Sequence, residues 1–156
     1  MWEITDQQLS DHSEWLKSNG QSGSRMDKTG RDLSNSAHPG AKMDQGKFIG
    51  ARFNNANLEG ASFAEADFSG ARLEKANLKG VNFRGADLGG VTLDGADLTG
   101  ADLTNADCSG ATFRNANMTN TICTNIDFVA ADLTGAKQDG MKISGEARLR
   151  DAQGLK

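Results

Sequence analysis

A strict five-residue period constrains this chain more than any other feature of its sequence. Written in fives from Ala51, the chain reads ARFNN, ANLEG, ASFAE, ADFSG, ARLEK, ANLKG and continues without insertion to ADLTG at residues 131–135. All seven Phe stand at the third place of a unit, and 15 of the 19 Gly stand at numbers ending in 0 or 5. Such regular placement indicates a repeat architecture, in which each unit packs on its neighbours.

Each unit carries the alternation of a β-strand followed by a turn. Ala usually occupies the first place and Leu or Phe the third, with a polar residue between them, so two side chains point inward and one points outward. Gly at the fifth place permits the positive φ of a tight turn. The chain therefore winds around an apolar axis, and its coils must stack at about the 4.8 Å spacing of paired strands. The period alone leaves the number of corners per coil open.

These units resemble the A(D/N)LXX motif of the pentapeptide-repeat family over about residues 26–145. The resemblance implies an all-β solenoid, a right-handed quadrilateral β-helix with four pentapeptides in each coil. Columns of residues twenty apart should then be chemically alike, and they are. One predicted core ladder is Phe53, Leu73, Leu93, Phe113 and Leu133, and another is Ala56, Ala76, Ala96, Ala116 and Ala136.

The N-terminal segment, residues 1–25, is predicted to be a capping helix and a linker. Thr5 and Gln8 have the spacing of a capping box, and Gly20 follows the last turn. A helix over residues 6–18 places Leu9, His12 and Leu16 on one face, with Trp15 adjacent. We expect this helix to cover the first coil.

The two ends of the repeat are less regular than its centre, residues 46–145. We expect the degenerate first coil, residues 26–45, to be irregular or partly open, because Lys28 and His38 stand where Leu or Phe is usual. Residues 146–156 form a C-terminal cap or tail, and a short capping helix over residues 145–153 with Leu149 inward would cover unpaired strand edges. A homodimer formed through this end is the alternative.

Composition excludes several classes of protein. The formal charge of −4, from 17 basic and 21 acidic groups, argues against direct nucleic-acid binding, which requires neutralisation of phosphates. The sequence has no run of about 20 apolar residues and no signal pattern, so we expect a cytoplasmic protein without a membrane partner. Cys108 and Cys123 stand at places that elsewhere carry Leu or Phe, and resemble small buried hydrophobes.

No residue pattern indicates catalysis. His12 and His38 are the only histidines, and neither has a partner that would make a nucleophile or a metal site. The corners account for the glycines, and an outer solenoid face offers no cleft in which paired carboxylates could do acid–base work. We therefore predict a protein that is not an enzyme and that uses no cofactor and no metal.

One outer face is acidic. Its second-place column runs Lys47, Asp67, Asp87, Asp107, Asp127, and Asp102 lies in the same stretch, Gly85 to Phe113, that lacks Lys and Arg. In one interpretation, these side chains only bond the backbone at each corner. In the other, Asp67, Asp87, Asp107, Asp127 and Asp102 form a candidate partner-binding face for a basic protein. Both can hold together.

The leading functional hypothesis is a protein-interaction module or scaffold whose partner the sequence does not identify. An alternative follows from the resemblance, because one branch of the family binds type II topoisomerases by resembling duplex DNA in shape and charge. That branch implies DNA gyrase or topoisomerase IV as a partner, which the protein would protect or inhibit. The acidic centre fits this branch, whereas the modest net charge, the interspersed Arg and Lys, and the lack of a projecting loop do not. A secreted or membrane-associated role lacks any targeting signal.

Overall fold

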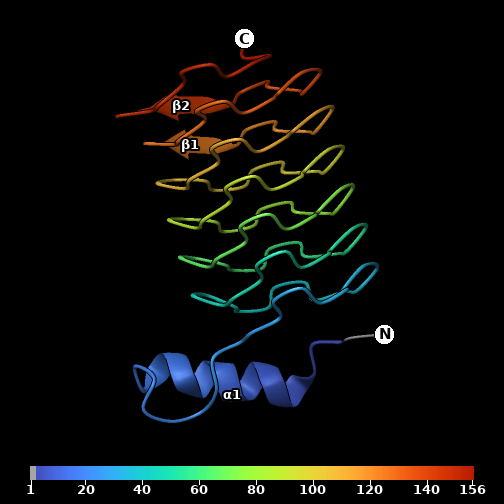
Figure 1. The fold of residues 1–156 in the computed structure, drawn as a ribbon, viewed down its shortest axis with the longest axis vertical. Coiled ribbons are helices and arrows are strands. Elements are labelled where there is room, and N and C mark those ends of the chain that lie inside the picture. Colours follow the sequence, from blue (N-terminus) through green and yellow to red (C-terminus); the bar gives the residue numbers. More distant parts are fainter. Residues whose placement is uncertain (1–2) are drawn as a thin grey trace.

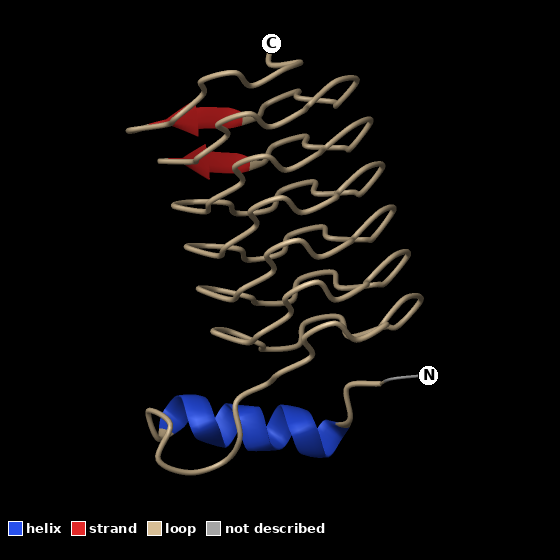
Figure 2. Ribbon diagram, in the orientation of Figure 1, coloured by secondary structure: helices blue, strands red, loops and turns tan. Residues whose placement is uncertain are grey.

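The computed structural model describes residues 3–156 as one helix followed by a stack of coils (Figure 1). The helix α1, Asp6–Lys17, lies across the N-terminal end of the stack, and the C-terminus lies at the opposite end. The regular strands of the described chain are β1 (Ile122–Thr124) and β2 (Lys142–Ser144), and most of each coil consists of single bridges separated by turns (Figure 2). Among the described residues, no helix has the length and apolar character needed to cross a membrane.

The helix α1 begins and ends where the local sequence predicts. The Thr5 hydroxyl accepts the Gln8 N–H at 3.2 Å, and the Gln8 side chain accepts the Thr5 N–H at 3.1 Å, which completes the capping box. Ser18 is the C-cap, and Gly20 has a φ of 83°. The predicted helix is therefore confirmed, with an end one residue earlier than expected. His12 on its inner face is 0% exposed, so the helix packs against the coils.

Backbone bridges join residues twenty positions apart, so four pentapeptides make one coil. All bridges are parallel, and one column runs Asp27, Lys47, Asp67, Asp87, Asp107, Asp127, Arg148. Each coil bonds the coil on either side. The Asp87 N–H donates to the Ala66 carbonyl at 2.9 Å, and the Leu88 N–H donates to the Asp107 carbonyl at 2.7 Å. The fold is the right-handed quadrilateral β-helix that the resemblance implied, in which stacking satisfies the backbone groups of every inner coil.

A residue with positive φ makes each corner at the fifth place. Gly90 has a φ of 62° and Asn115 a φ of 56°, and Gly and Asn adopt this left-handed region at the least cost. Glu65, Lys75 and Ala130 adopt it as well, with φ values of 57°, 58° and 56°. Pairing with the neighbouring coils therefore imposes the turn even where the local residue does not favour it.

Inward side chains at the first and third places form one continuous apolar core. The residues of the two predicted ladders are each 0% or 1% exposed: Phe53, Leu73, Leu93, Phe113, Leu133, Ala56, Ala76, Ala96, Ala116 and Ala136. Aromatic rings fill the N-terminal half of this core. The ring centroid of Phe68 lies 4.7 Å from that of Phe48, 4.9 Å from that of Phe63 and 5.4 Å from that of Phe83. Such edge and stacked contacts stabilise a core beyond the area that they bury.

The prediction of an irregular first coil, residues 26–45, is wrong. This coil pairs with the second on all four sides, through Asp27↔Lys47, Asp32↔Arg52, Ala37↔Asn57 and Lys42↔Ser62. The inward Lys28 is 5% exposed, and its Nζ donates to the Glu3 carbonyl at 3.1 Å and to the Gln8 side chain at 2.8 Å. Backbone pairing with the next coil sets the path of the chain, and the N-terminal segment supplies polar partners for the buried ammonium group.

The predicted capping helix over residues 145–153 is also wrong, because the chain continues there as a further part of the solenoid. Glu146 is a one-residue insertion, so Asp127 bridges Arg148 instead of a residue twenty positions on. The Glu146 N–H donates to the Asn125 side chain at 2.8 Å. Continued pairing satisfies backbone groups of the coil beneath, which a helix would leave open. Leu149, predicted to point inward, is 39% exposed at this end.

Candidate functional site

The four carboxylates predicted for one outer face form a continuous row. Their column is bridged in the order Asp67, Asp87, Asp107, Asp127, and we call these four residues the acidic row. Lys47 bridges its first member and Arg148 bridges its last. Strand pairing places neighbouring second-place side chains about 4.8 Å apart. The row is therefore a ladder of like charges with one basic residue at each end.

Each carboxylate of the acidic row closes a local turn. Its Oδ1 accepts the N–H of the residue two positions later, at 3.0 Å for Asp67 and at 2.9 Å for Asp87, Asp107 and Asp127. This bond is the corner-stabilising contact that Asp and Asn side chains commonly make. The first of the two predicted roles is thus present in the structure.

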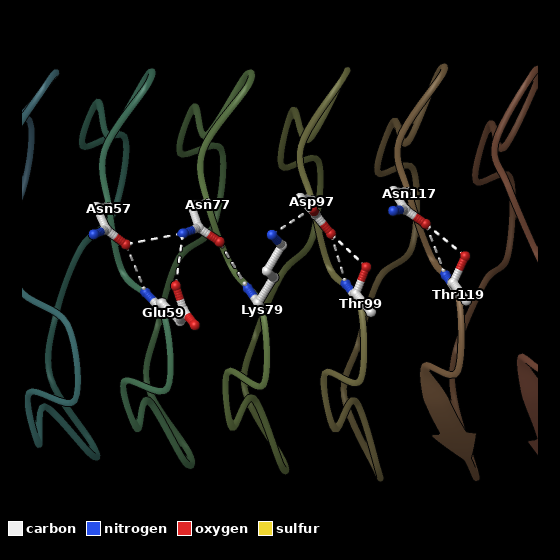
Figure 3. Close-up of polar contacts among 8 residues, drawn as sticks. All are labelled: Asn57, Glu59, Asn77, Lys79, Asp97, Thr99, Asn117 and Thr119. Carbon is white, nitrogen blue, oxygen red and sulfur yellow. Dashed lines mark hydrogen bonds and ion pairs between the residues drawn. The ribbon is translucent and has the colours of Figure 1, made fainter.

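The same turn bond recurs in a column on another face, where Figure 3 shows Asn57, Asn77, Asp97 and Asn117. A carboxamide therefore closes this turn as a carboxylate does. Side chains in and beside this column also contact each other between coils. Asn77 donates to Asn57 at 3.1 Å, and Lys79 lies 3.5 Å from Asp97 (Figure 3). The turn bond alone does not explain why the acidic row contains only carboxylates.

Members of the acidic row differ in how their charge is balanced. The Arg148 Nη1 lies 2.6 Å from the Asp127 Oδ2, and the Asp127 side chain is 16% exposed. Asp67 accepts a second hydrogen bond, from the Ser69 hydroxyl. Within residues 3–156, no basic side chain forms an ion pair with Asp87 or Asp107, and both residues are exposed. The centre of the row therefore presents two unpaired carboxylates to solvent.

Asp102 lies outside the acidic row. Its column pairs it with Asn82 and Ile122 on the neighbouring face, and Arg84 lies 3.0 Å from its Oδ2. Burial opposes ionisation of this carboxyl, but hydrogen bonds from Thr104 and Arg84 hold the pKa of Asp102 below its usual value. Its charge is balanced within the chain, unlike the charges of Asp87 and Asp107.

Small residues lie beside the centre of the acidic row. The fourth-place residues next to its first three members are Ser69, Gly89 and Ser109. Ile49, which is 39% exposed, and the half-buried Val129 stand at the two ends of this column. The sequence analysis did not single out Ile49, although an aliphatic residue at an outward place of the repeat indicates an exposed apolar contact. It missed Arg148 because a helix was expected there.

Across residues 3–156, the structure shows no constellation suited to metal binding: no group of three or more His, Cys, Asp or Glu residues could hold a metal ion. The ring nitrogens of His12 both contact backbone groups. Cys108 and Cys123 are free, buried thiols. Burial raises the pKa of both, to about 12 for Cys123, which leaves them unreactive. What the outer surface offers is charge and shape, which suit binding.

A family model described as pentapeptide repeats matches residues 47–80, 81–120 and 113–140 of the chain, in eight copies. No curated protein sequence matches the chain at a significant level.

Solved structures of pentapeptide-repeat proteins resemble the fold. A trypsin-treated form of QnrB1, a plasmid-mediated fluoroquinolone resistance protein, gives a TM-score of 0.55 at 20% identity, over 81% of this chain and 72% of that one. HetL, a protein involved in heterocyst differentiation regulation from the cyanobacterium Nostoc sp. strain PCC 7120, gives a TM-score of 0.40 at 26% identity, over 83% of this chain and 70% of that one. Rfr23 from the cyanobacterium Cyanothece 51142 gives a TM-score of 0.41 at 21% identity, over 90% of this chain and 98% of that one. The likeness to QnrB1 shows a shared fold.

Proposed function

This chain belongs to the pentapeptide-repeat family, and from that premise we propose that it is a non-enzymatic protein-interaction module whose binding surface is the acidic row. The observation that carries the proposal is the pair of exposed carboxylates of Asp87 and Asp107, which form no ion pair and lie beside small residues at the centre of the acidic row. A rigid solenoid keeps these groups at fixed spacing, so little side-chain or backbone order is lost when a partner binds.

The negative charges of the acidic row repel each other, and turn formation does not require these charges. Two carboxylates about 4.8 Å apart repel each other by about 1 kcal/mol even in water. Asn57, Asn77 and Asn117 form the same turn without charge on another face. The presence of Asp at the same place in four successive coils therefore supports a role in recognition, for which negative charge is useful.

The partner that fits this face is a protein surface with regularly spaced Lys or Arg side chains. A basic surface would relieve the repulsion within the row and would be steered toward it at low salt. Ile49 at one end of the face is 39% exposed and offers an apolar contact beside the charged one. A strongly acidic partner, or the phosphate backbone of a nucleic acid, is disfavoured by the same charges.

An affinity capture from the source cell tests this proposal. The bait is the full chain, compared with the double variant Asp87→Asn and Asp107→Asn. The matched control is Asp97→Asn with Asp139→Asn, which removes the same charge from another face. We expect a partner that the wild type and the control retain and that the first variant loses. Equal capture by all three proteins would show that the acidic row is not the binding surface.

A second candidate function is mimicry of DNA toward a type II topoisomerase. It is favoured by the fold shared with QnrB1, a fluoroquinolone resistance protein, and by the acidic row. Several acidic residues on the other faces form ion pairs, however, including Asp102 with Arg84 and Asp132 with Arg114. Part of the negative charge outside the acidic row is therefore balanced within the chain, and this candidate ranks second.

Purified protein in a gyrase assay tests the second candidate. A DNA mimic would inhibit supercoiling or protect the enzyme from quinolone-stabilised cleavage, and topoisomerase IV is tested in parallel by decatenation and cleavage. Absence of both effects with both enzymes would remove this function, while the interaction module would stand.

We also propose that a second copy of the chain covers the C-terminal end. Leu149 is 39% exposed there, and Met141, Ile143 and Leu155 are only partly buried against the core. Two such ends could pair their strand edges and bury these side chains. Sedimentation velocity over a wide concentration range tests the pairing. A strict monomer at high concentration would contradict it.

A further inference from the structure

His12 joins the N-terminal helix to both ends of the first coil. It lies on the inner face of α1 and is 0% exposed. Its Nδ1 accepts the N–H of Met26, which begins the first coil, at 2.9 Å. Its Nε2 lies 2.9 Å from the carbonyl oxygen of Asp44, near the end of the same coil. One imidazole ring therefore holds the helix to the two ends of this coil.

These two contacts fix the protonation state of the ring. A backbone N–H only donates and a carbonyl only accepts, so Nδ1 must be unprotonated and Nε2 must carry the hydrogen. The neutral imidazole satisfies both contacts. A proton added at Nδ1 of His12 would face the Met26 N–H, so one hydrogen bond would be lost and a charge would be buried.

The surroundings offer a protonated ring little compensation. The helix contributes Trp15, whose ring stacks on the imidazole with centroids 5.8 Å apart. Two charged groups face the ring: Arg25 from the linker and Asp44 from the first coil. The Asp44 Oδ1 is already bonded to the Ala64 N–H at 2.8 Å. Burial lowers the pKa of His12, the carbonyl and carboxylate of Asp44 offset this only in part, and Arg25 adds to the lowering.

Part of the contact between the helix segment and the first coil is polar, although Leu33 and Met43 of this coil are buried in the core. The inward Lys28 bonds to the Glu3 carbonyl and to the Gln8 side chain. Ser36 and His38, also at inward places, each have a buried side-chain atom without a hydrogen-bond partner. The equivalent places in the second coil carry Phe, Ala and Leu. Water can therefore replace the helix at this end at a lower cost than it could replace a coil.

We propose that His12 is a pH-sensitive latch: the neutral ring holds α1 on the first coil, and protonation of the ring releases the helix and uncovers the N-terminal end of the solenoid. An undocked His12 has its ordinary pKa of 6.5, whereas the docked ring resists protonation. Docking is therefore at full strength above this pH and weakens as the pH falls below it, because only the undocked ring takes up the proton readily.

Hydrogen–deuterium exchange on the full chain tests the latch, with rates corrected for the intrinsic effect of pH. Linkage to one proton limits the loss of protection in α1 to about tenfold per pH unit. We expect a loss approaching this limit between about pH 6.5 and about pH 5, with residues 86–120 unchanged. The His12 ring, followed by NMR, should stay neutral in the docked protein and take up its proton only below pH 6.5. Unchanged α1 protection, or loss shared equally by residues 86–120, would overturn the proposal.

Two variants separate the two histidines. His12→Gln removes the latch histidine, so α1 should be less protected at neutral pH and its protection should depend much less on pH. Burial also lowers the pKa of His38. His38→Gln should still keep most of the dependence of the wild type, because the His38 Nε2 has no hydrogen-bond partner to lose. If the dependence persists in His12→Gln or disappears in His38→Gln, His12 is not the latch.

Discussion

The first and second coils have the same backbone but different interiors. In three columns, Lys28, Ser36 and His38 of the first coil lie beneath Phe48, Ala56 and Leu58 of the second. Both coils nevertheless form the same parallel bridges and the same positive-φ corners. A fully apolar interior is therefore not needed to form a coil when a completed coil lies next to it. Its contribution is to the stability of the stack.

The difference also shows what each neighbour supplies. The second coil lies between two other coils, and its inward side chains are 0% or 1% exposed. The first coil has a coil on one side and the helix α1 on the other, and the helix segment provides polar partners for Lys28. A solenoid end can thus carry polar inward residues provided that its cap satisfies them.

The largest expected effect comes from truncating the same column in the two coils. Phe48→Ala removes a ring that packs 4.7 Å from Phe68 and 5.4 Å from Phe63, and should lower the free energy of unfolding by about 3–5 kcal/mol. Lys28→Ala removes two hydrogen bonds at the end of the stack and should cost about 1 kcal/mol. Chemical denaturation of both variants checks this, and equal losses would show that the two interiors contribute alike.

A smaller effect is expected when bulk is added to the alanine ladder. Ala96 is 0% exposed and is stacked between Ala76 and Ala116, so Ala96→Leu should destabilise the protein by about 1–3 kcal/mol or more through overpacking. Thr99→Lys, at an outward place of the same unit, should stay within about 0.5 kcal/mol. Equal shifts in melting temperature would show that the inward and outward assignment is wrong.

Returning the first coil to the repeat pattern should have a still smaller effect, of opposite sign. The Ser36 hydroxyl is buried without a hydrogen-bond partner, so Ser36→Ala removes an unsatisfied group and continues the alanine ladder. We expect the free energy of unfolding to hold or to rise by up to about 1 kcal/mol. A clear fall in thermal stability would indicate that water or another group satisfies this hydroxyl.

The period predicted a coil with a corner every five residues, and the family resemblance, which implied four pentapeptides per coil, predicted the columns of residues twenty apart. The prediction failed at both ends for one physical reason. There we judged the chain by its own residues, whereas pairing with the adjacent coil determines its path, even around the inserted Glu146. The two contacts of His12 could not be predicted, because they depend on how the helix docks rather than on any repeat.

Part of the candidate site could be predicted from the sequence in the same way. The acidic row follows from the twenty-residue columns, and the turn bonds follow from Asp at the second place of each unit. The ion pair between Arg84 and Asp102 joins residues of adjacent coils, and the same spacing relates Arg114 to Asp132. The repeat therefore also predicts these pairs. When charge is assigned to a face, residues in neighbouring columns of adjacent coils should be compared, as well as residues within one column.

The smallest effect on stability, and the sharpest test of the outer face, comes from Asp87→Asn with Asp107→Asn. Asn keeps the turn bond and removes repulsion, so the melting temperature should hold or rise slightly. Asp27 provides a matched control in the first coil, because it makes the same turn bond to Thr29 at 3.0 Å but lies beside Lys47 instead of another carboxylate. Asp27→Asn should therefore lose a weak attraction and lower the melting temperature slightly.

Association separates recognition from turn formation in the same variants. If the acidic row attracts a basic partner, the double variant should bind more slowly and its association rate should depend less on salt, while Asp27→Asn should change neither. Stopped-flow or surface binding at low and high salt measures both quantities. Should the double variant associate as fast as the wild type at every salt concentration, the charge of the row would have no part in recognition. The carboxylates would then act only by closing the turns at the corners.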